Sequence, residues 1–292
     1  MRLHICNAPA TLRLPEMHFV LASGELGTLA LGLAIAAVFG GLIAGTLGVD
    51  VGIVVVPVLY HVLVLIGVDE SLRMHLAIGT SLAAILPVSL ASILAPQNGD
   101  AVDRDLLRRW SIPMFVGALI GCALVGVLSG RTLALIFACV ALVAALWFAF
   151  SGEKRRLADR LPSGAAGLAL PALTGGISAM MGIGGSTLGV PTLTSFGVPA
   201  PRAIASATLF GAIVAVPGTI AAIVLGRHAP GLPPYSFGYV NLLGVLLIAP
   251  ISFATARAGS ALGQMTDPNR FRILLALFIV LMTGRMLYDA FG

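Results

Sequence analysis

Two glycine-rich stretches interrupt apolar segments at matched places in the chain: "GTLGVDVG" at 45–52 and "MMGIGGST" at 180–187. Glycine lets backbone N–H groups approach a ligand closely. A helix that begins after such a break directs its N–H groups and its positive dipole end into the gap. Two helix starts facing each other therefore predict an anion site. The alternative is that the small residues serve close helix packing.

Polar residues beside the two stretches complete the candidate site. Hydroxyls at 80 and 206 stand at matched places and suit substrate oxygens, or bond within their own helices. Arg202 is suited to drawing an anion to the mouth of the site, or to anchoring its helix at the membrane interface. The predicted substrate-binding residues are Gly48, Asp50, Gly52, Thr80, Ser81, Gly182, Gly184, Gly185, Ser186, Thr187, Arg202 and Ser206.

Two residues are candidates for proton coupling. Asp50 lies in the middle of an apolar stretch, where carboxylates usually face a cavity and act. An equal alternative is that it caps the helix that follows it, because Asp is a favoured N-cap residue. His75 is the second candidate, because histidine is the side chain suited to shuttle protons near neutral pH. Its alternative role is hydrogen bonding at the membrane interface.

The composition indicates a polytopic membrane protein. Of 292 residues, 58% are hydrophobic and 10% are charged, whereas a soluble domain carries about 25% charged residues. We therefore expect a lipid bilayer around the chain and no nucleic-acid partner. Three cysteines without a CxxC or Cys/His cluster predict neither metal nor cofactor. The chain has no HExxH or GxSxG motif, so an enzyme is not expected.

The apolar stretches predict an all-α polytopic membrane protein with two inverted repeats of about five helical segments each. The first two segments of each repeat are expected to be short or broken at the glycine-rich motifs. The predicted organisation is an N-terminal tail (1–26), repeat 1 (27–150), a cytoplasmic linker (151–162) and repeat 2 (163–292). The ten stretches are 27–48, 50–67, 75–96, 111–129, 131–150, 163–182, 184–197, 202–226, 238–258 and 270–290.

The internal repeat is visible in two motifs that occur in the same order in each half. Gly48 aligns with Gly182, and "AIGTSL" (77–82) aligns with "AIASAT" (203–208). Four connectors hold eleven of the seventeen basic residues and are predicted to be cytoplasmic by the positive-inside rule. They are 96–109, 151–164, 198–202 and 257–272. An odd number of segments inverts the second copy, as in many secondary transporters.

Longer motifs resemble the sulfite exporter TauE/SafE family, also called the TSUP permeases. They include "GVDVGIVVVPVLY", "LRMHLAIGTSLAAILP", "GIGGSTLGVPTLTSFGVPAPRAIASATLFGAIVAVPGT" and "LPPYSFGYVNLLGVLLIAP". The resemblance covers roughly 35–290 and implies a multi-pass carrier of the bacterial inner membrane for small sulfur-containing or organic anions. Some members are thought to use a proton gradient. Asp50 departs from the family's usual GxGGG pattern, because it aligns with Gly184.

These observations predict a secondary transporter that moves a small anion by alternating access. The expected substrate is a sulfur oxyanion or an organosulfonate such as sulfite or sulfoacetate. Export follows from the resemblance alone, whereas proton coupling is suggested both by the resemblance and by Asp50 and His75. The alternatives are an anion channel and an uptake permease for another small organic acid. The sequence leaves the oligomeric state open.

Overall fold

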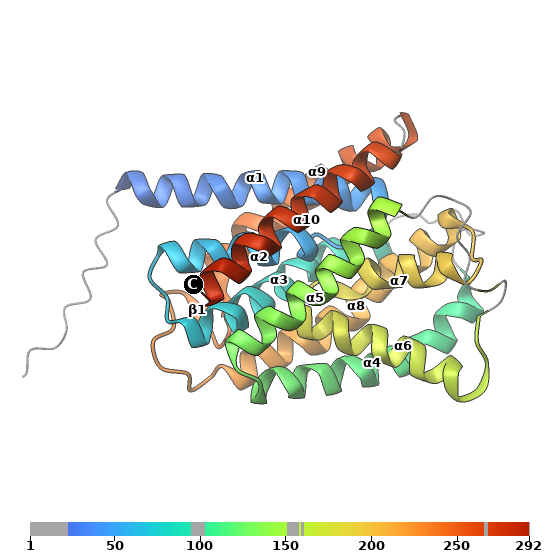
Figure 1. Cartoon of the computed structure of the whole chain (residues 1–292), viewed down its shortest axis with the longest axis horizontal. Coiled ribbons are helices and arrows are strands. Elements are labelled where there is room, and N and C mark those ends of the chain that lie inside the picture. Colours follow the sequence, from blue (N-terminus) through green and yellow to red (C-terminus); the bar gives the residue numbers. More distant parts are fainter. Residues whose placement is uncertain (1–22, 95–102, 151–157, 159–160, 266–267, 292) are drawn as a thin grey trace, which may run out of the picture.

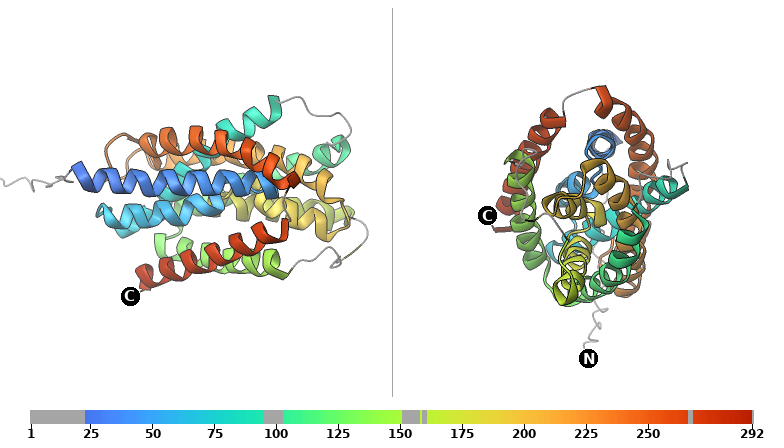
Figure 2. Two further views of the ribbon diagram at one scale, coloured as in Figure 1. Left: turned by 90° about the horizontal axis from the view of Figure 1, so that it is seen from above. Right: turned by 90° about the vertical axis from the view of Figure 1, so that its right-hand side faces the viewer.

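The computed structural model describes residues 23–94, 103–150, 158, 161–265 and 268–291, and over these it is almost entirely helical. Most helices run along the long axis of the molecule (Figures 1 and 2). Together with one two-stranded hairpin, the elements are α1 (Ser23–Leu47), α2 (Gly52–Leu65), α3 (Glu70–Leu94), α4 (Arg104–Val127), α5 (Gly130–Phe150), α6 (Gly164–Met181), α7 (Gly184–Ser195), α8 (Ala200–Leu225), β1 (Ser236–Phe237), β2 (Val240–Asn241), α9 (Leu242–Met265) and α10 (Pro268–Phe291).

Eight of these helices are long and apolar enough to cross a bilayer. The two others are α2, with 14 residues, and α7, with 12. At about 1.5 Å per residue they reach only about two thirds of a hydrocarbon core of about 30 Å. They are the segments predicted to be short, and each begins directly after a glycine-rich break. The predicted all-α membrane fold is confirmed.

Several helix ends differ from the predicted apolar boundaries. α1 begins at Ser23 and α4 at Arg104, although polar residues had placed both starts in connectors. Asp103 explains the early start of α4, because its carboxylate accepts hydrogen bonds from the backbone N–H groups of Asp105 and Leu106. α9 runs on to Met265, so the predicted connector at 257–272 begins inside a helix. Hydropathy detects the lipid-crossing part of a helix and misses its polar ends.

The predicted stretch at 238–258 also begins differently, with a hairpin instead of a helix. Val240 pairs with Phe237 and Asn241 pairs with Ser236. The Oδ1 atom of Asn241 then accepts a hydrogen bond from the backbone N–H of Gly244 at 3.0 Å, in the first turn of α9. Asn241 is thus a polar residue at the start of a predicted apolar span. It ends the hairpin and caps the helix that follows.

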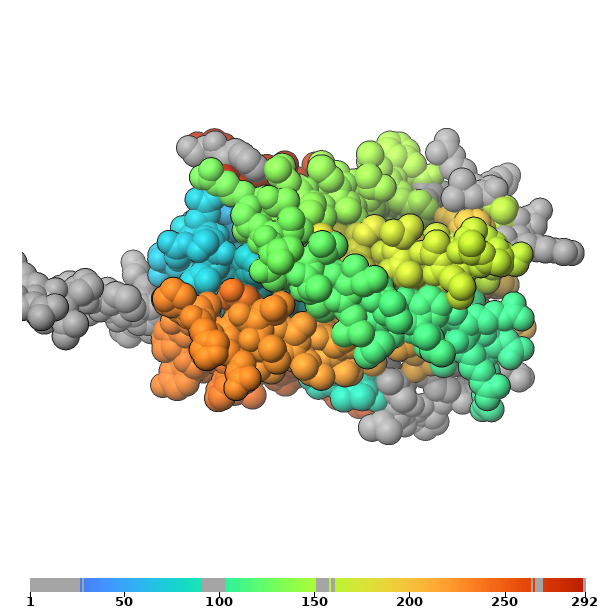
Figure 3. All heavy atoms as spheres, turned by 90° about the horizontal axis from the view of Figure 1, so that it is seen from below, coloured from blue at the N-terminus to red at the C-terminus, as the bar shows by residue number. Residues whose placement is uncertain are grey.

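Close helix pairs hold the two halves of the fold together. α1 packs along α9, and α4 packs along α6; the surface of α4 runs directly beside that of α6 (Figure 3). This close approach requires glycine at the contact points, because a side chain there would clash with the neighbouring helix. A Cβ on Gly117 would lie 1.9 Å from the carbonyl oxygen of Ala172, and one on Gly45 would lie 2.0 Å from that of Ala256. Small residues are how membrane helices bring their backbones together.

The pattern of helix pairs is the one that two copies related by a two-fold axis would give. In such a repeat each of α1 to α5 corresponds to the helix five places further along the chain, α6 to α10. The pair α1–α9 then corresponds to α6–α4, and the pair α2–α3 corresponds to α7–α8. All four pairs are in contact. The pairs α3–α8 and α5–α10 map onto themselves. The start of α1 and the end of α10 lie at one end of the molecule, and the start of α6 lies at the other (Figure 1). The inverted repeat and its domain boundaries remain predictions that this packing fits.

Candidate substrate site

The two glycine-rich breaks lie against each other in the structure. α1 ends at Leu47 and α2 begins at Gly52, while α6 ends at Met181 and α7 begins at Gly184. Gly48 and Gly182 follow the ends of α1 and α6 with φ angles of +69° and +71°. This left-handed conformation is the usual way for a glycine to end a helix. The two breaks therefore begin at equivalent positions, because the sequence alignment pairs Gly48 with Gly182.

Asp50 joins the two breaks. Its Oδ2 atom accepts a hydrogen bond of 2.8 Å from the backbone N–H of Ser186, and its own N–H donates to the hydroxyl of Thr187 at 3.1 Å. The Thr187 hydroxyl in turn donates to the carbonyl of Ile183. Asp50 is 9% exposed. One buried carboxylate from the first half thus satisfies the first turn of α7 in the second half.

This contact corrects the expected capping role of Asp50. The predicted alternative was that Asp50 caps α2, the helix that follows it. At the start of α2 the N-cap residue is Val51, which makes no side-chain capping bond. α7 likewise has no cap from its own N-cap residue, Ile183. Asp50 supplies that cap from the other half of the chain, where its negative charge also complements the positive end of the helix dipole.

The glycines around Asp50 leave room for these contacts. Gly184 has a φ angle of +71°, and a Cβ there would lie 2.4 Å from Oδ2 of Asp50. A Cβ on Gly52 would lie 2.4 Å from the carbonyl oxygen of Gly182, which also accepts a hydrogen bond from the Ser81 hydroxyl at 2.8 Å. At these positions the glycines allow close packing between the two breaks, and their role in substrate binding stays a prediction.

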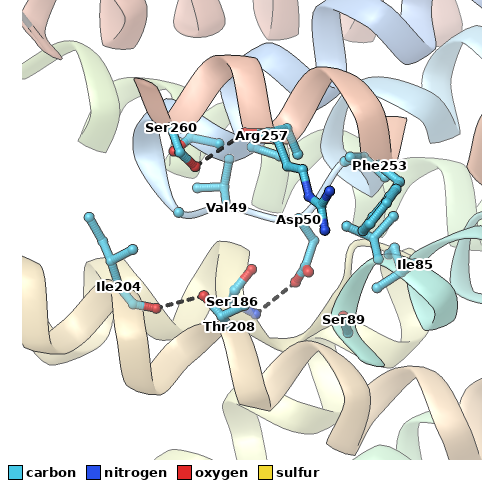
Figure 4. Close-up of a pocket in the computed structure, with 16 residues that line it drawn as sticks. Val49, Asp50, Ile85, Ser89, Ser186, Ile204, Thr208, Phe253, Arg257 and Ser260 are labelled. Carbon is cyan, nitrogen blue, oxygen red and sulfur yellow. Dashed lines mark hydrogen bonds between the residues drawn. The ribbon is translucent and has the colours of Figure 1, made fainter. Parts of the chain in front are cut away.

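A cavity of about 220 Å³ opens beside Asp50 (Figure 4). It lies between the end of α1, the break at 48–51, α3, the start of α7, α8 and α9. Of the predicted site residues, it is lined by Gly48, Asp50 and Ser186. The other lining residues are Ala44, Gly45, Val49, Val51, Ile85, Val88, Ser89, Ile204, Thr208, Phe253, Ala256, Arg257 and Ser260.

Arg257 is the cation of this cavity among the lining residues. Its guanidinium carbon lies 4.6 Å from the centre of the Phe253 ring, and the group projects into the cavity toward Asp50 (Figure 4). A guanidinium stays charged and presents several N–H donors in one plane, which suits an oxyanion. Stacking on Phe253 holds it in place without using those donors.

Sequence reasoning missed Arg257 because the residue lies at the very end of the predicted apolar stretch at 238–258, where the predicted connector at 257–272 begins. It was counted among the cytoplasmic basic residues that report topology. The signal that could have found it is the spacing of Phe253 and Arg257, which are four residues apart. In a helix, a spacing of four residues places both side chains on one face.

Several predicted residues lie near the breaks but do not line the cavity. Thr187 bonds Asp50, and Gly185 packs so closely on α8 that a Cβ would lie 2.3 Å from the carbonyl oxygen of Phe210. The hydroxyl of Thr80 accepts a hydrogen bond from the backbone N–H of Asn241, and that of Ser206 accepts one from the N–H of Asp103. In this conformation the matched hydroxyls hold the scaffold together.

The two remaining predicted residues lie away from the cavity. Arg202 is exposed at the start of α8 and does not line it. His75 is buried on α3, where its ring nitrogens lie 2.9 Å from the carbonyl oxygen of Ser71 and 3.0 Å from that of Val125.

The fold and the cavity define the class of protein: a multi-pass membrane protein with interrupted helices beside a small open cavity, an arrangement typical of membrane transporters. The sulfite exporter TauE/SafE family matches residues 33–286, and the chain belongs to this family. The expected family resemblance is confirmed.

Curated relatives carry the same general description. A probable membrane transporter protein of Haemophilus influenzae is 29% identical over 246 residues, which cover 84% of this chain and 93% of the relative. Similar proteins of the same description occur in Methanocaldococcus jannaschii, with 24% identity over 83% of this chain and 89% of the relative, and in Bacillus subtilis, with 22% over 85% and 95%. No solved structure matches the chain. The protein is therefore a membrane transporter.

Proposed function

We propose that the protein carries a small anion, of the sulfur oxyanion or organosulfonate class, across the bacterial inner membrane by alternating access. The observation that carries the proposal is the guanidinium of Arg257 inside the cavity at the paired helix breaks. Pockets for drug-sized ligands measure about 300–1,000 Å³, so a cavity of about 220 Å³ suits a smaller solute. Sulfite and sulfoacetate are of this kind.

Asp50 can couple anion binding to proton binding. Its carboxylate lines the same cavity as Arg257, so an incoming anion meets a resident negative charge. A proton on Asp50 removes this repulsion and weakens its hold on the N–H of Ser186. Proton and anion then bind together, and each raises the affinity for the other by linkage. Asp50 thereby competes with the substrate for the anion-binding end of α7.

The direction of transport depends on whether that proton crosses with the anion. A membrane potential that is negative inside expels an uncompensated anion, which is the export that the family's description suggests. An anion that crosses with its proton follows the proton gradient instead. We propose export, with the state of Asp50 setting how strongly the proton gradient affects it.

Transport by the purified wild-type protein in proteoliposomes tests the proposed function. We expect saturable flux of sulfoacetate or sulfite that responds to an imposed potential and to a pH gradient. Sulfate, thiosulfate and small carboxylates, assayed by competition, define the anion class. Flux that stays linear in concentration and ignores counter-gradients would indicate a channel. Absence of binding and flux for all these anions would refute the proposal.

Replacing Asp50 with asparagine should separate transport from the proton gradient. Asparagine keeps a side-chain oxygen that can accept from the Ser186 N–H, but it cannot gain or lose a proton. We expect anion binding to persist and the response of flux to a pH gradient to disappear. Asp103→Asn is the matched control, because Asp103 also caps a helix but does not line the cavity. An unchanged pH response in Asp50→Asn would leave Asp50 only its capping role.

A further inference from the structure

A second, much smaller cavity of about 10 Å³ lies among α3, α4, α6 and α8. Its lining includes His75, Leu82, Cys122, Val125 and Tyr239. None of these residues lines the large cavity. Several residues that line the small cavity are equivalent, across the internal repeat, to residues that line the large one.

The helices that line the two cavities correspond to one another across the repeat. In α3 and α8 the aligned motifs pair Ile78 with Ile204, and Leu82 with Thr208. Ile204 and Thr208 line the large cavity, while Ile78 and Leu82 line the small one. The same positions of two aligned motifs therefore border both cavities.

The close helix contacts extend this match to α4 and α9. A Cβ on Gly121 would lie 2.3 Å from the carbonyl oxygen of Gly176, and one on Gly259 would lie 2.3 Å from that of Leu42. Leu42 and Gly176 are aligned in α1 and α6, so Gly121 and Gly259 are equivalent.

The residues that follow these two glycines also border the two cavities. Cys122 follows Gly121 and lines the small cavity; Ser260 follows Gly259 and lines the large one. Ala179 and its aligned partner Gly45 divide between the cavities in the same way. Four pairs of equivalent residues, on three pairs of helices, thus place one member at each cavity. The small cavity therefore occupies the place in the repeat that corresponds to the large one, with a much smaller volume.

His75 closes the small cavity. Its Nδ1 atom lies 2.9 Å from the carbonyl oxygen of Ser71, and its Nε2 atom lies 3.0 Å from that of Val125. The first contact stays within α3, and the second bridges α3 to α4. A neutral imidazole has a single N–H, so both bonds form at once only in the protonated ring. The ring of Tyr239 packs 5.0 Å away and covers the other side.

We propose that the small cavity is the closed passage through which the substrate reaches the opposite side of the membrane, and that His75 is its lock. This inference rests on the proposed transport function. As the large cavity closes, the contact between His75 and the Val125 carbonyl breaks and the passage opens between α3, α4 and α8. The residue equivalent to Arg257 is Leu119, so the second passage has no matching cation. It therefore conducts the anion without binding it tightly.

Cys122 serves as a natural reporter of this passage. In the Cys6→Ser, Cys139→Ser variant, Cys122 is the single thiol. A water-soluble maleimide should label it slowly, at a rate set by the population of the open passage. Adding Ser260→Trp places a large ring in the large cavity, which then cannot close. We expect labelling of Cys122 to fall by about tenfold or more, because the wedge disfavours the alternative state.

The reciprocal experiment uses the equivalent position. The three native cysteines are replaced and Ser260→Cys is introduced. The new thiol should then react rapidly with the water-soluble maleimide. A cavity of about 10 Å³ cannot hold a tryptophan unless the passage opens. Cys122→Trp in that protein should therefore slow labelling of Ser260→Cys by about tenfold or more. Size-exclusion chromatography checks that each protein is folded.

Leu262→Trp is the control for the wedges, because Leu262 is exposed on α9 and lines neither cavity. It should leave the labelling of Cys122 unchanged. Equal labelling of Cys122 with and without Ser260→Trp would overturn the inference. If transport persists in the same preparations, the proposed function survives that result; if wild type transports none of the anions, the proposed function fails on its own.

The lock itself is tested with His75→Ala against Leu82→Ala. Both changes enlarge the small cavity, but only the first removes the bridge between α3 and α4. We expect faster labelling of Cys122 in His75→Ala than in Leu82→Ala. Equal rates would show that labelling follows packing volume alone, and His75 would then not be the lock.

Discussion

The Arg257→Gln variant is expected to bind sulfoacetate or sulfite about 10- to 100-fold more weakly than wild type. A hydrogen bond to a charged group contributes about 1.5–3 kcal/mol, and each 1.4 kcal/mol changes affinity about tenfold. Glutamine retains a polar side chain of similar reach but has no charge. Titration calorimetry of the purified protein measures the effect, and Arg257→Lys separates loss of charge from loss of the planar guanidinium.

Arg202→Gln is the matched control for this prediction. Arg202, like Arg257, is exposed, and it lies two residues from the cavity-lining Ile204, but it does not itself line the large cavity. Its loss removes the same charge from the protein without removing a donor from the cavity. We expect its anion affinity to stay close to wild type at moderate ionic strength. If Arg202→Gln weakened binding and Arg257→Gln did not, the site would lie at the mouth that the sequence alone suggested.

Much of the architecture could be predicted because the bilayer constrains it strongly. Each span needs a run of apolar residues, so the ten stretches matched the ten helices to within a few residues at most ends. The breaks could be predicted because glycine in a span is otherwise unfavourable. Gly48 and Gly182 end their helices in the left-handed conformation. These features depend on local sequence and its repetition.

The site was harder to predict, because it depends on how helices from the two halves meet. The sequence marked Asp50 as an acid in an apolar stretch, but its partner Ser186 is 136 residues away. Thr80 and Ser206 looked like substrate ligands, yet in this conformation each accepts a backbone N–H. A buried hydroxyl needs a partner, and periodicity does not reveal whether that partner is a ligand or the protein.

The structure also changes how the anion site is understood. Two bare helix starts would form a simple cradle for an anion. The start of α7 instead already holds a carboxylate, and the start of α2 carries no side-chain cap. Asp50 thus links the two halves mechanically and electrostatically. We expect a substrate that displaces Asp50 to weaken the contact between the breaks and so to connect binding to the relative movement of the halves.

Replacing Gly184 with alanine is expected to break the hydrogen bond between Asp50 and the start of α7 while leaving a folded protein. The added Cβ would lie 2.4 Å from Oδ2 of Asp50 and would push the carboxylate off the N–H of Ser186 into the cavity. There it would pair with Arg257 or repel the substrate, so anion affinity should fall by about tenfold or more. The left-handed φ of +71° adds strain of about 1–2 kcal/mol for a residue with a side chain.

Gly67→Ala is the control that separates the backbone strain of a left-handed φ from the clash of the added Cβ with Asp50. Gly67 has a similar φ of +73°, and a Cβ there would meet no atom within 4 Å. Both variants should therefore lose some thermal stability, but only Gly184→Ala should lose anion binding. Measuring melting temperature and affinity on the same preparations separates the two effects. If Gly184→Ala melted at a lower temperature and bound the anion as tightly as wild type, the glycine would serve packing alone, and Asp50 would not control the site.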